Sequence, residues 1–299
     1  MTDIQSRSSE MTQDSATARV RALVRTSAEV FRRMPLMTRL ALLIVVFYAI
    51  VFVFAPLLAP YGEREIVGNQ YEVWSAQFPL GTDQLGRDFL SRLIYGARNS
   101  IGIALATTCV SIIAGFALGI FSAARGGIVD VIIARALDIF LAIPQLIFAL
   151  ILIAVLGTSV PLLIAILGLL EALKVARLAR AAAGDIMALD YIEVARIQGE
   201  SELWIMFREV LPNLRTLLIA EFGLRFCLVF LLVSSLSFLG VGVQPPAADW
   251  GSMVRENATL ITYGEITPLL PAAAIAVLAV SVNILVDWLT DDTRGQADA

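Results

Sequence analysis

Long stretches of apolar residues without a single charge constrain this chain more than any other feature of its sequence. Such stretches run through residues 40–58, 100–124 and 139–170. About 20 apolar residues form an α-helix long enough to cross the hydrocarbon core of a bilayer. The chain is also 58% hydrophobic and only 16% charged, whereas soluble domains carry about 25% charged residues. The pattern therefore predicts an all-α, polytopic membrane protein.

The apolar segments predict six transmembrane helices. The uncharged stretch from Ile139 to Leu170 is too long for one helix across about 30 Å of hydrocarbon, so we expect a break at 157–161. The spans are expected at 40–58, 100–124, 131–156, 162–178, 216–240 and 267–287. The chain then divides into a polar tail (1–37, with an amphipathic helix near 20–34), a first helix with an outer loop (38–99), a five-helix core (100–290) and a second tail (291–299).

The distribution of basic residues predicts that both termini are cytoplasmic. Most of the 22 lysines and arginines fall in the two tails and in the segments 125–135 and 174–215. Cytoplasmic loops of membrane proteins carry an excess of Lys and Arg. The expected outer loops hold only Arg64, Arg87, Arg92, Arg98 and Arg255.

The composition excludes most catalytic chemistry. The chain has no histidine, and its two cysteines, Cys109 and Cys227, lie in apolar runs. Lys174, the single lysine, follows no glycine-rich loop, so the chain has no P-loop for ATP. A net charge of -4 without a basic patch argues against nucleic acid. We expect a protein that is not an enzyme and binds neither a metal ion nor a cofactor.

One inner loop is long enough to hold structure of its own. In the segment of about 180–215, helix-forming residues run to Gln198 and are followed by Gly199, which suits the left-handed end of a helix. A second amphipathic stretch starts at Glu200 and is interrupted at Pro212. The pattern predicts two short helices joined at Gly199. They are either an interfacial element on the membrane or a docking element for a cytosolic partner.

Four motifs in order resemble a known family of membrane proteins. Glu193, Ala195 and Gly199, followed by Leu211-Pro212, resemble the EAA loop of ABC-importer permeases. The other three motifs are the outer segment 79–98, the segment 138–144 that ends in Pro144, and the segment 236–251 that ends in Trp250-Gly251. Together they resemble the second permease subunit of dipeptide and oligopeptide importers over residues of about 38 to 290.

The resemblance implies a type I ABC-importer permease of the bacterial inner membrane. Such a subunit pairs with a homologous permease as a heterodimer, with two cytosolic ABC ATPases and with an extracytoplasmic solute-binding protein. The solute is expected to be a di- or oligopeptide, with a nickel chelate, an opine or a sugar as alternatives. A gradient-driven secondary transporter or channel is the alternative from another class, although we find no inverted repeat and no filter-like glycine run.

The resemblance also implies residue roles. The helix before the EAA glycine would dock on the ATPase, with Ala195 small enough for close approach and Glu193 free to pair with the partner, unless it pairs with Arg196 in its own helix. The docking residues are expected to be Tyr191, Glu193, Ala195, Arg196, Gly199 and Glu200. In the outer loop, Asp83, Arg87 and Asp88 are candidates for contact with the binding protein, or else part of a solvated face.

Charged residues inside the expected spans need partners, since an unpaired charge there costs about 3 kcal/mol or more. Arg225 has three possible roles: an ion pair with Glu171 across two helices, an ion pair with Glu221 within its own helix, or a position on the solute path. Arg135 and Asp138 share a helix face three residues apart, so we expect them to pair with each other.

Overall fold

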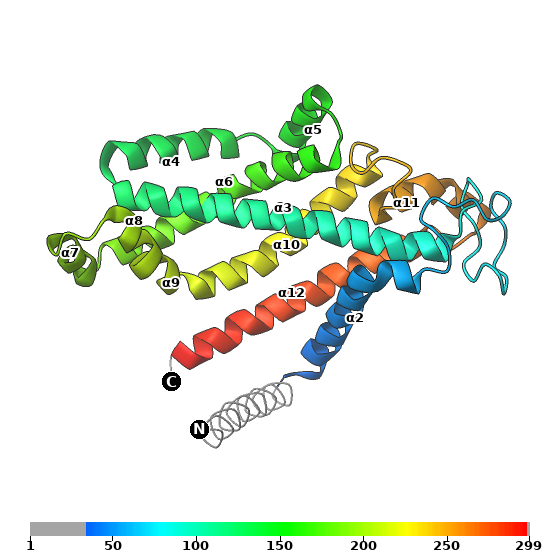
Figure 1. Ribbon diagram of the computed structural model, residues 1–299, viewed down its shortest axis with the longest axis horizontal. Helices are drawn as coiled ribbons and strands as arrows, with labels where there is room; N and C mark the ends of the chain where they lie inside the picture. Colours follow the sequence, from blue (N-terminus) through cyan, green and yellow to red (C-terminus); the bar gives the residue numbers. More distant parts are fainter. Residues whose placement is uncertain (1–33, 298–299) are drawn as a thin grey trace, which may run out of the picture.

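The computed structural model describes residues 34–297, and the side chains of residues 34–290, as an elongated bundle of helices (Figure 1). Regular structure in this part of the chain is helical apart from two isolated β-bridges, Ile66–Arg87 and Thr82–Asp88. The predicted all-α class is therefore confirmed for the described residues. The amphipathic helix expected near 20–34 lies outside them, except for its last position.

Five long helices frame the bundle: α2 (Leu36–Leu58), α3 (Phe89–Arg125), α6 (Val160–Met187), α10 (Arg215–Phe238) and α12 (Leu269–Ala297). Between α3 and α6 the chain forms α4 (Gly127–Leu141) and α5 (Gln145–Leu156). The shorter elements are α7 (Asp190–Ile197), α8 (Glu202–Trp204), the π-helical turn η1 (Ile205–Val210), α9 (Leu211–Asn213), α11 (Trp250–Asn257) and the 3-10 helix η2 (Ala258–Tyr263).

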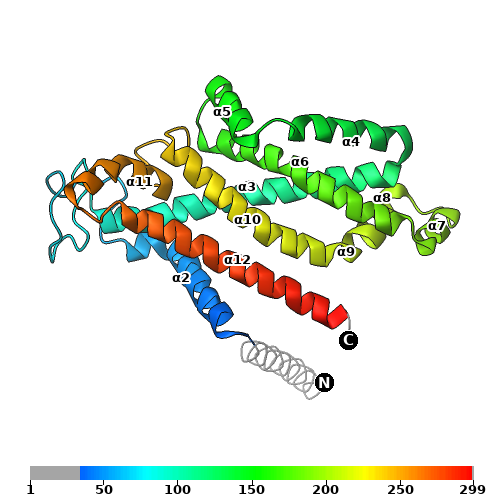
Figure 2. The same cartoon turned by 180° about the vertical axis from the view of Figure 1, so that it is seen from behind.

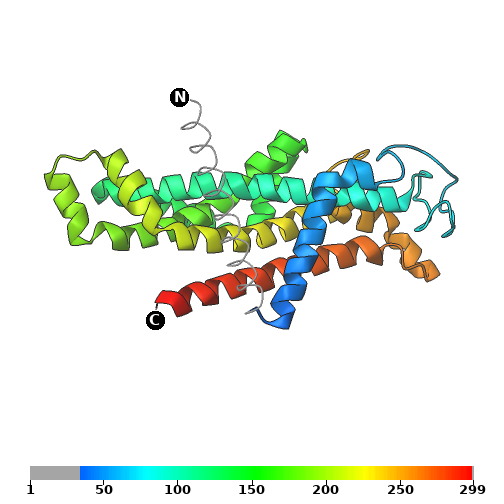
Figure 3. The ribbon, with the colours of Figure 1, turned by 60° about the horizontal axis from the view of Figure 1, so that its bottom comes forward.

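The molecule is elongated, and its two ends differ in structure. Helices α3, α6 and α10 run along this axis, α12 lies beside α10, and α2 crosses α12 obliquely (Figures 2 and 3). Helix α7 forms one end, and the loop 59–88 with α11 and η2 forms the other (Figure 1). One buried apolar cluster, which includes Phe230 and Trp250, lies toward the loop end. A second, which includes Phe116 and Val175, lies toward α7.

Helices α3 and α6 approach each other so closely that only glycine fits at their contact. A Cβ atom on Gly119 would lie 2.6 Å from the carbonyl oxygen of Ala176, and one on Gly115 would lie 2.9 Å from that of Ala172. A Cβ on Gly168 of α6 would lie 2.6 Å from Val110 of α3. Small residues let membrane helices pack backbone against backbone, where van der Waals contact replaces the missing hydrophobic drive.

The expectation of one continuous span over 131–156 is wrong. The structure has two helices there, α4 and α5, bent by 87° at the residues 142–144. Pro144 is the physical reason, because proline lacks an N–H group, clashes with the preceding turn and restricts Ile143 before it. The break expected at 157–161 is present as well, because α5 ends at Leu156 and Gly157 takes a positive φ of 106°.

Four described helices, α2, α3, α10 and α12, are long and apolar enough to cross a membrane, and the bent pair α4–α5 makes a fifth candidate if it counts as one span. Helix α6 is also long enough, with 28 residues. It is less apolar than these helices, because Glu171, Lys174 and Arg177 lie in its middle. Helix α3 starts at Phe89 rather than near 100, because Asp88 caps it and Arg92 is buried in ion pairs.

The α3–α6 contact predicts opposite effects for two glycine substitutions. Gly119→Ala forces the helices apart, and we expect it to lower the free energy of unfolding by about 1–3 kcal/mol, the usual cost of overpacking. Gly184→Ala is the matched control in α6, because a Cβ there meets no atom within 4 Å. It should be neutral, or stabilising by up to about 1 kcal/mol. Thermal unfolding of the detergent-solubilised protein measures both, and equal melting of the two variants would contradict the prediction.

Candidate functional site

The end of α7 has the geometry that the predicted turn at Gly199 requires. Gly199 has φ +85°, its N–H donates to Arg196 O at 3.0 Å, and the N–H of Glu200 donates to Ala195 O at 3.1 Å. This pair of bonds is a Schellman motif, which closes a helix with glycine in the left-handed region. Ser201 then caps α8 by accepting from the N–H of Trp204 at 3.2 Å. The two short helices joined at Gly199 are confirmed.

Helix α7 has two apolar faces, and only one is covered. Ile192 is fully buried and Ala195 nearly so, both in the cluster that includes Phe116 and Val175. On the other face, Val194 is 50% and Ile197 80% exposed, and Tyr191 is exposed beside them. An uncovered apolar face on a short helix at the tip of a protein marks a contact surface. Ala195, expected to approach a partner, instead packs against the chain's own helices.

The charged side chains of α7 do not pair with each other. Arg196 donates to the carbonyl oxygen of Ala124 at 3.5 Å, at the end of α3, instead of forming an ion pair with Glu193. Both border a hollow of about 530 Å³ together with Met187, Leu189 and Ile197. Glu193 and Glu200 are exposed, so their carboxylates are available to a partner.

The buried side of α7 is continuous with the long helices. Ile192 and Ala195 join η1 through Ile205 and Val210, and the same cluster includes residues of α3 and α6. Tyr191 adds a polar link to α9, because its hydroxyl accepts from Asn213 Nδ2 at 3.2 Å. A close-packed interior of this kind moves as a unit rather than deforming locally. A displacement of α7 therefore reaches α3 and α6 through η1, which contacts all three helices.

A group of five polar side chains inside the bundle contains all three predicted intramembrane charges; we call it the charge cluster. Arg225 of α10 donates to Glu171 of α6 at 2.8 Å and also bonds Glu221 in its own helix. Two of the roles considered for Arg225 thus occur together. Lys174 lies 3.1 Å from Glu171, and Gln145 bonds both Glu171 and Lys174. Two carboxylates and two cations balance in charge.

The sequence analysis missed Gln145 and Lys174 as members of this cluster. Gln145 is the first residue of α5, directly after the break at Pro144, so it ties the bent segment to α6. The available signal was a polar residue that follows a proline within an uncharged run.

The expected pair of Arg135 with Asp138 is replaced by contacts to another helix. Asp138 lies 3.9 Å from Arg177 of α6. About two turns earlier in α4, Asp130 binds Arg180 of α6 through both carboxylate oxygens and accepts a hydrogen bond from Ser122 of α3. Helix α6 runs alongside α4, so its arginines reach these carboxylates across the helix pair. The ion pairs therefore hold α4 to α6.

The outer-loop residues matched by resemblance lie inside the protein. Asp83, Arg87 and Asp88 are all buried. Asp83 accepts from Arg87 Nε at 2.7 Å and lies 3.2 Å from Arg92 Nε, while Asp88 accepts from the N–H of Ser91 at 2.7 Å and so caps α3. Neither a solvated face nor a directly exposed contact describes these three residues, because Asp83 and Arg87 bind each other and Asp88 binds the start of α3.

One partner of this outer cluster lies far from it in sequence and could not be read from the motif. Glu256 of α11 lies 3.3 Å from Arg92 and 3.7 Å from Arg87. Nearby, Asp249 accepts from Ser100 Oγ at 2.7 Å and from the N–H of Ser252 at 3.0 Å, which caps α11. Burial raises the pKa of the Asp249 carboxyl above its usual range. These contacts fasten α11 to the outer part of α3.

No group of three His, Cys, Asp or Glu side chains in the described part of the chain is placed to hold a metal ion. The described geometry combines a helix with an uncovered apolar face at one end, a balanced set of charges within the bundle and a loop fastened by ion pairs at the other end.

Comparison with known proteins agrees with this geometry. The sequence pattern of the family described as the binding-protein-dependent transport system inner membrane component matches residues 115–293. That range starts within α3 and includes the charge cluster and α7 with its turn at Gly199.

Relatives over most of the chain have names that point the same way. The di/tripeptide transport system permease protein DppC of Pseudomonas aeruginosa is 36% identical, with 84% of each chain covered. The peptide transport system permease protein SapC of Escherichia coli is 34% identical over 80% of this chain and 83% of that protein. The glutathione transport system permease protein GsiD of Pectobacterium atrosepticum is 32% identical over 71% and 70%. This chain therefore belongs to the inner membrane components of binding-protein-dependent transport systems, the permease subunits of bacterial ABC importers.

Proposed function

We propose that this chain forms one half of the pathway of an ATP-driven importer for di- or oligopeptides. It pairs with a homologous permease as a heterodimer, and each half docks on one of two cytosolic ATPases. The single observation that carries the proposal is the uncovered apolar face of α7, a helix whose other face is buried in the apolar cluster that it shares with η1, α3 and α6.

The position of α7 supports its role as the docking element. The helix projects at the tip of the molecule (Figure 1), its end is fixed by the Schellman motif at Gly199, and Glu193 and Glu200 are free at its exposed side. An exposed apolar patch rimmed by charges fits a protein partner. In this proposal Tyr191, Val194 and Ile197 contact the ATPase, Ala195 and Arg196 hold α7 to its own subunit, and closure of the ATPase dimer moves the bundle.

The proposed topology has six spans with both termini in the cytoplasm. It counts the four long apolar helices, the broken pair α4–α5 and α6. Helix α6 qualifies because Glu171 and Lys174 are paired, which lowers the cost of carrying them in a span. The positive-inside distribution supports the orientation, and the ends of α2 and α12 support it too, since α2 starts and α12 ends toward the α7 side (Figure 2).

The peptide solute is supported by the names of the relatives, which include permeases for di/tripeptides, peptides and glutathione. The charge cluster has a proposed part in the same cycle. It joins α5, α6 and α10 at the break beside Pro144, where a discontinuous helix is able to change direction. We place it as a polar hinge that keeps these three helices in register while the bundle rocks.

Co-purification and uptake test the proposed function directly. The membrane-extracted wild-type chain should bring with it a P-loop ATPase and a second polytopic permease, identified by mass spectrometry. Proteoliposomes of that complex should take up a labelled tripeptide when the binding protein and ATP are supplied. A chain that emerges alone, or uptake that follows an ion gradient and ignores ATP, would support a secondary transporter instead.

The docking role of α7 predicts that one added charge on its open face blocks transport. Ile197→Asp places a carboxylate on the apolar contact and should reduce co-purified ATPase and ATP-driven uptake at least tenfold. Gln198→Asp is the matched control, because it adds the same charge at the next position in place of a polar side chain. Both residues are exposed, so neither change should lower the melting temperature. Equal uptake by the two variants would show that α7 is not part of the interface with the ATPase.

The charge cluster predicts a loss of stability that a second substitution repairs. Arg225→Met leaves the buried Glu221 without its cation, and breaking a buried pair in this way costs about 3–5 kcal/mol. Adding Glu221→Gln removes the orphaned charge, while Glu171 keeps Lys174, so the double variant should regain much of the lost stability. Arg215→Met, at the exposed start of α10, is the control. Thermal unfolding in detergent would contradict the cluster if Arg225→Met alone melts like the wild type.

A further inference from the structure

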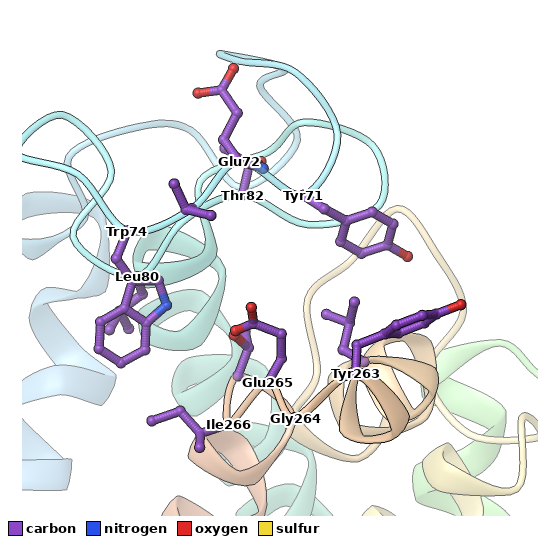
Figure 4. Close-up of a pocket in the computed structure, with 12 residues that line it drawn as sticks. Tyr71, Glu72, Trp74, Leu80, Thr82, Tyr263, Gly264, Glu265 and Ile266 are labelled. Atoms are coloured by element: carbon purple, nitrogen blue, oxygen red, sulfur yellow. Dashed lines mark hydrogen bonds between the residues drawn. The ribbon is translucent and has the colours of Figure 1, made fainter.

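The outer end of the molecule contains an open hollow of about 530 Å³. One wall is the loop segment 71–82, and the other is the end of η2 with the residues that lead into α12 (Figure 4). Roughly 300–1,000 Å³ is the size range of sites that take a small ligand or an inserted side chain. Asp83, Arg87 and Asp88 do not line this hollow, because they are buried elsewhere.

Three aromatic rings and one carboxylate face this hollow. Figure 4 shows Tyr71 and Tyr263 on one side, Trp74 on the other, and the carboxylate of Glu265 between them. Glu72 also belongs to the wall, but its carboxylate points away (Figure 4) and accepts from the backbone and side chain of Asn69 at 2.7 Å. Glu265 is thus the acid that the hollow presents.

The rings are held open to solvent. Tyr263 is 82% exposed, and Trp74 and Tyr71 are exposed as well. No Lys or Arg lines the hollow, and among the described side chains no cation lies within ion-pair distance of Glu265. Clustered exposed aromatic residues are typical of interaction sites.

Tyr71 is in addition held in a strained backbone conformation. Within residues 34–297 it is the one non-glycine residue with positive φ, at 54°. The loop enforces this geometry, because Tyr71 N–H donates to Asp83 O at 3.1 Å and Thr82 Oγ1 accepts from the N–H of Glu72 at 2.8 Å. Positive φ is unfavourable for a bulky side chain, and such strain concentrates at functional sites. The buried outer cluster around Asp83 thereby aims a ring at the hollow.

Aromatic faces around a carboxylate are complementary to an organic cation. Arg and Lys side chains bind favourably over the faces of aromatic rings, and the carboxylate adds a charge-assisted hydrogen bond. An arginine fits best, since its planar guanidinium both stacks on rings and forms paired bonds with a carboxylate. The hollow is therefore built for a guanidinium or ammonium group.

We propose that this hollow receives an arginine or lysine side chain of the extracytoplasmic solute-binding protein when that protein docks. The inference rests on the proposed function in so far as it takes the loop end as the outer face. The segments that line the hollow, part of the loop 59–88 and the end of η2, lie at the end of the molecule opposite α7 (Figure 1). The chain's family works with a binding protein. A pocket with aromatic walls that takes one basic side chain is the usual form of an interface hot spot.

Binding measurements on the complete transporter in nanodiscs test the proposal. The probe is the solute-binding protein that stimulates this transporter's ATPase, measured by surface plasmon resonance. Glu265→Gln and Tyr263→Ala should each raise its Kd at least tenfold. The matched control is Glu65→Gln, an exposed acid of the loop 59–88 at the same end of the molecule, whose acceptor role toward Gly62 a glutamine retains; its Kd should stay within twofold. The melting temperatures of all three complexes check folding.

Charge reversal identifies the partner group. Glu265→Arg should abolish docking, and replacing one arginine or lysine of the binding protein by glutamate should restore it. An unchanged Kd for both Glu265→Gln and Tyr263→Ala overturns the proposal. The proposal is also overturned if the loss of binding appears only when the binding protein carries a peptide with a free amino terminus, and not when the peptide is acetylated. In that case the amino group of the solute would occupy the hollow.

Failure of the proposed function gives a different result. In that case wild-type uptake follows an ion gradient, and no binding protein stimulates the ATPase. A different pair of results would refute the hollow alone. Uptake would be driven by ATP and depend on the binding protein, but both hollow variants would bind that protein with the wild-type Kd.

Discussion

The direct contact between the backbones of α3 and α6 is the interaction on which the other parts of this structure depend. Lipid surrounds the helices with apolar groups, so burial of apolar surface does little to bring them together. Gly115, Gly119 and Gly168 let the two helices approach until van der Waals contact holds them. Helix α6 leads directly into α7, and α3 reaches the outer cluster at its other end. The closely packed helices α3 and α6 therefore connect α7 to the opposite end of the molecule.

The charges inside the bundle are arranged around the same pair of helices. Helix α6 carries Glu171, Lys174, Arg177 and Arg180, and each finds a partner on α4, α5 or α10. These ion pairs hold the less closely packed helices to the α3–α6 pair. They also explain how α6 carries these four charged side chains and is still a long central helix of the bundle (Figure 1).

Local signals in the sequence predicted local structure well. The turn at Gly199 was predictable because a Schellman motif depends on only a few consecutive residues. Pro144 is an equally local signal for a helix break. The length of the uncharged run, however, required only one break, which was predicted at 157–161. The outer cluster was not predictable from its motif, since Arg92 and Glu256 meet only when α11 packs on α3. A loop rich in charged residues is expected to be exposed to solvent, but Asp83, Arg87, Asp88 and Arg92 are buried.

By itself, the sequence determined the membrane class, the apolar segments, the family resemblance and the turn after α7, because hydrophobic length and the left-handed freedom of glycine are properties of short stretches of chain. The tertiary structure alone decided which face of α7 stays open, that Ala195 points inward, and that Arg225 binds two carboxylates at once. It also decided that three rings and Glu265 share one hollow. Each of these depends on segments far apart in sequence coming within a few ångströms, and residue type and spacing do not encode that approach.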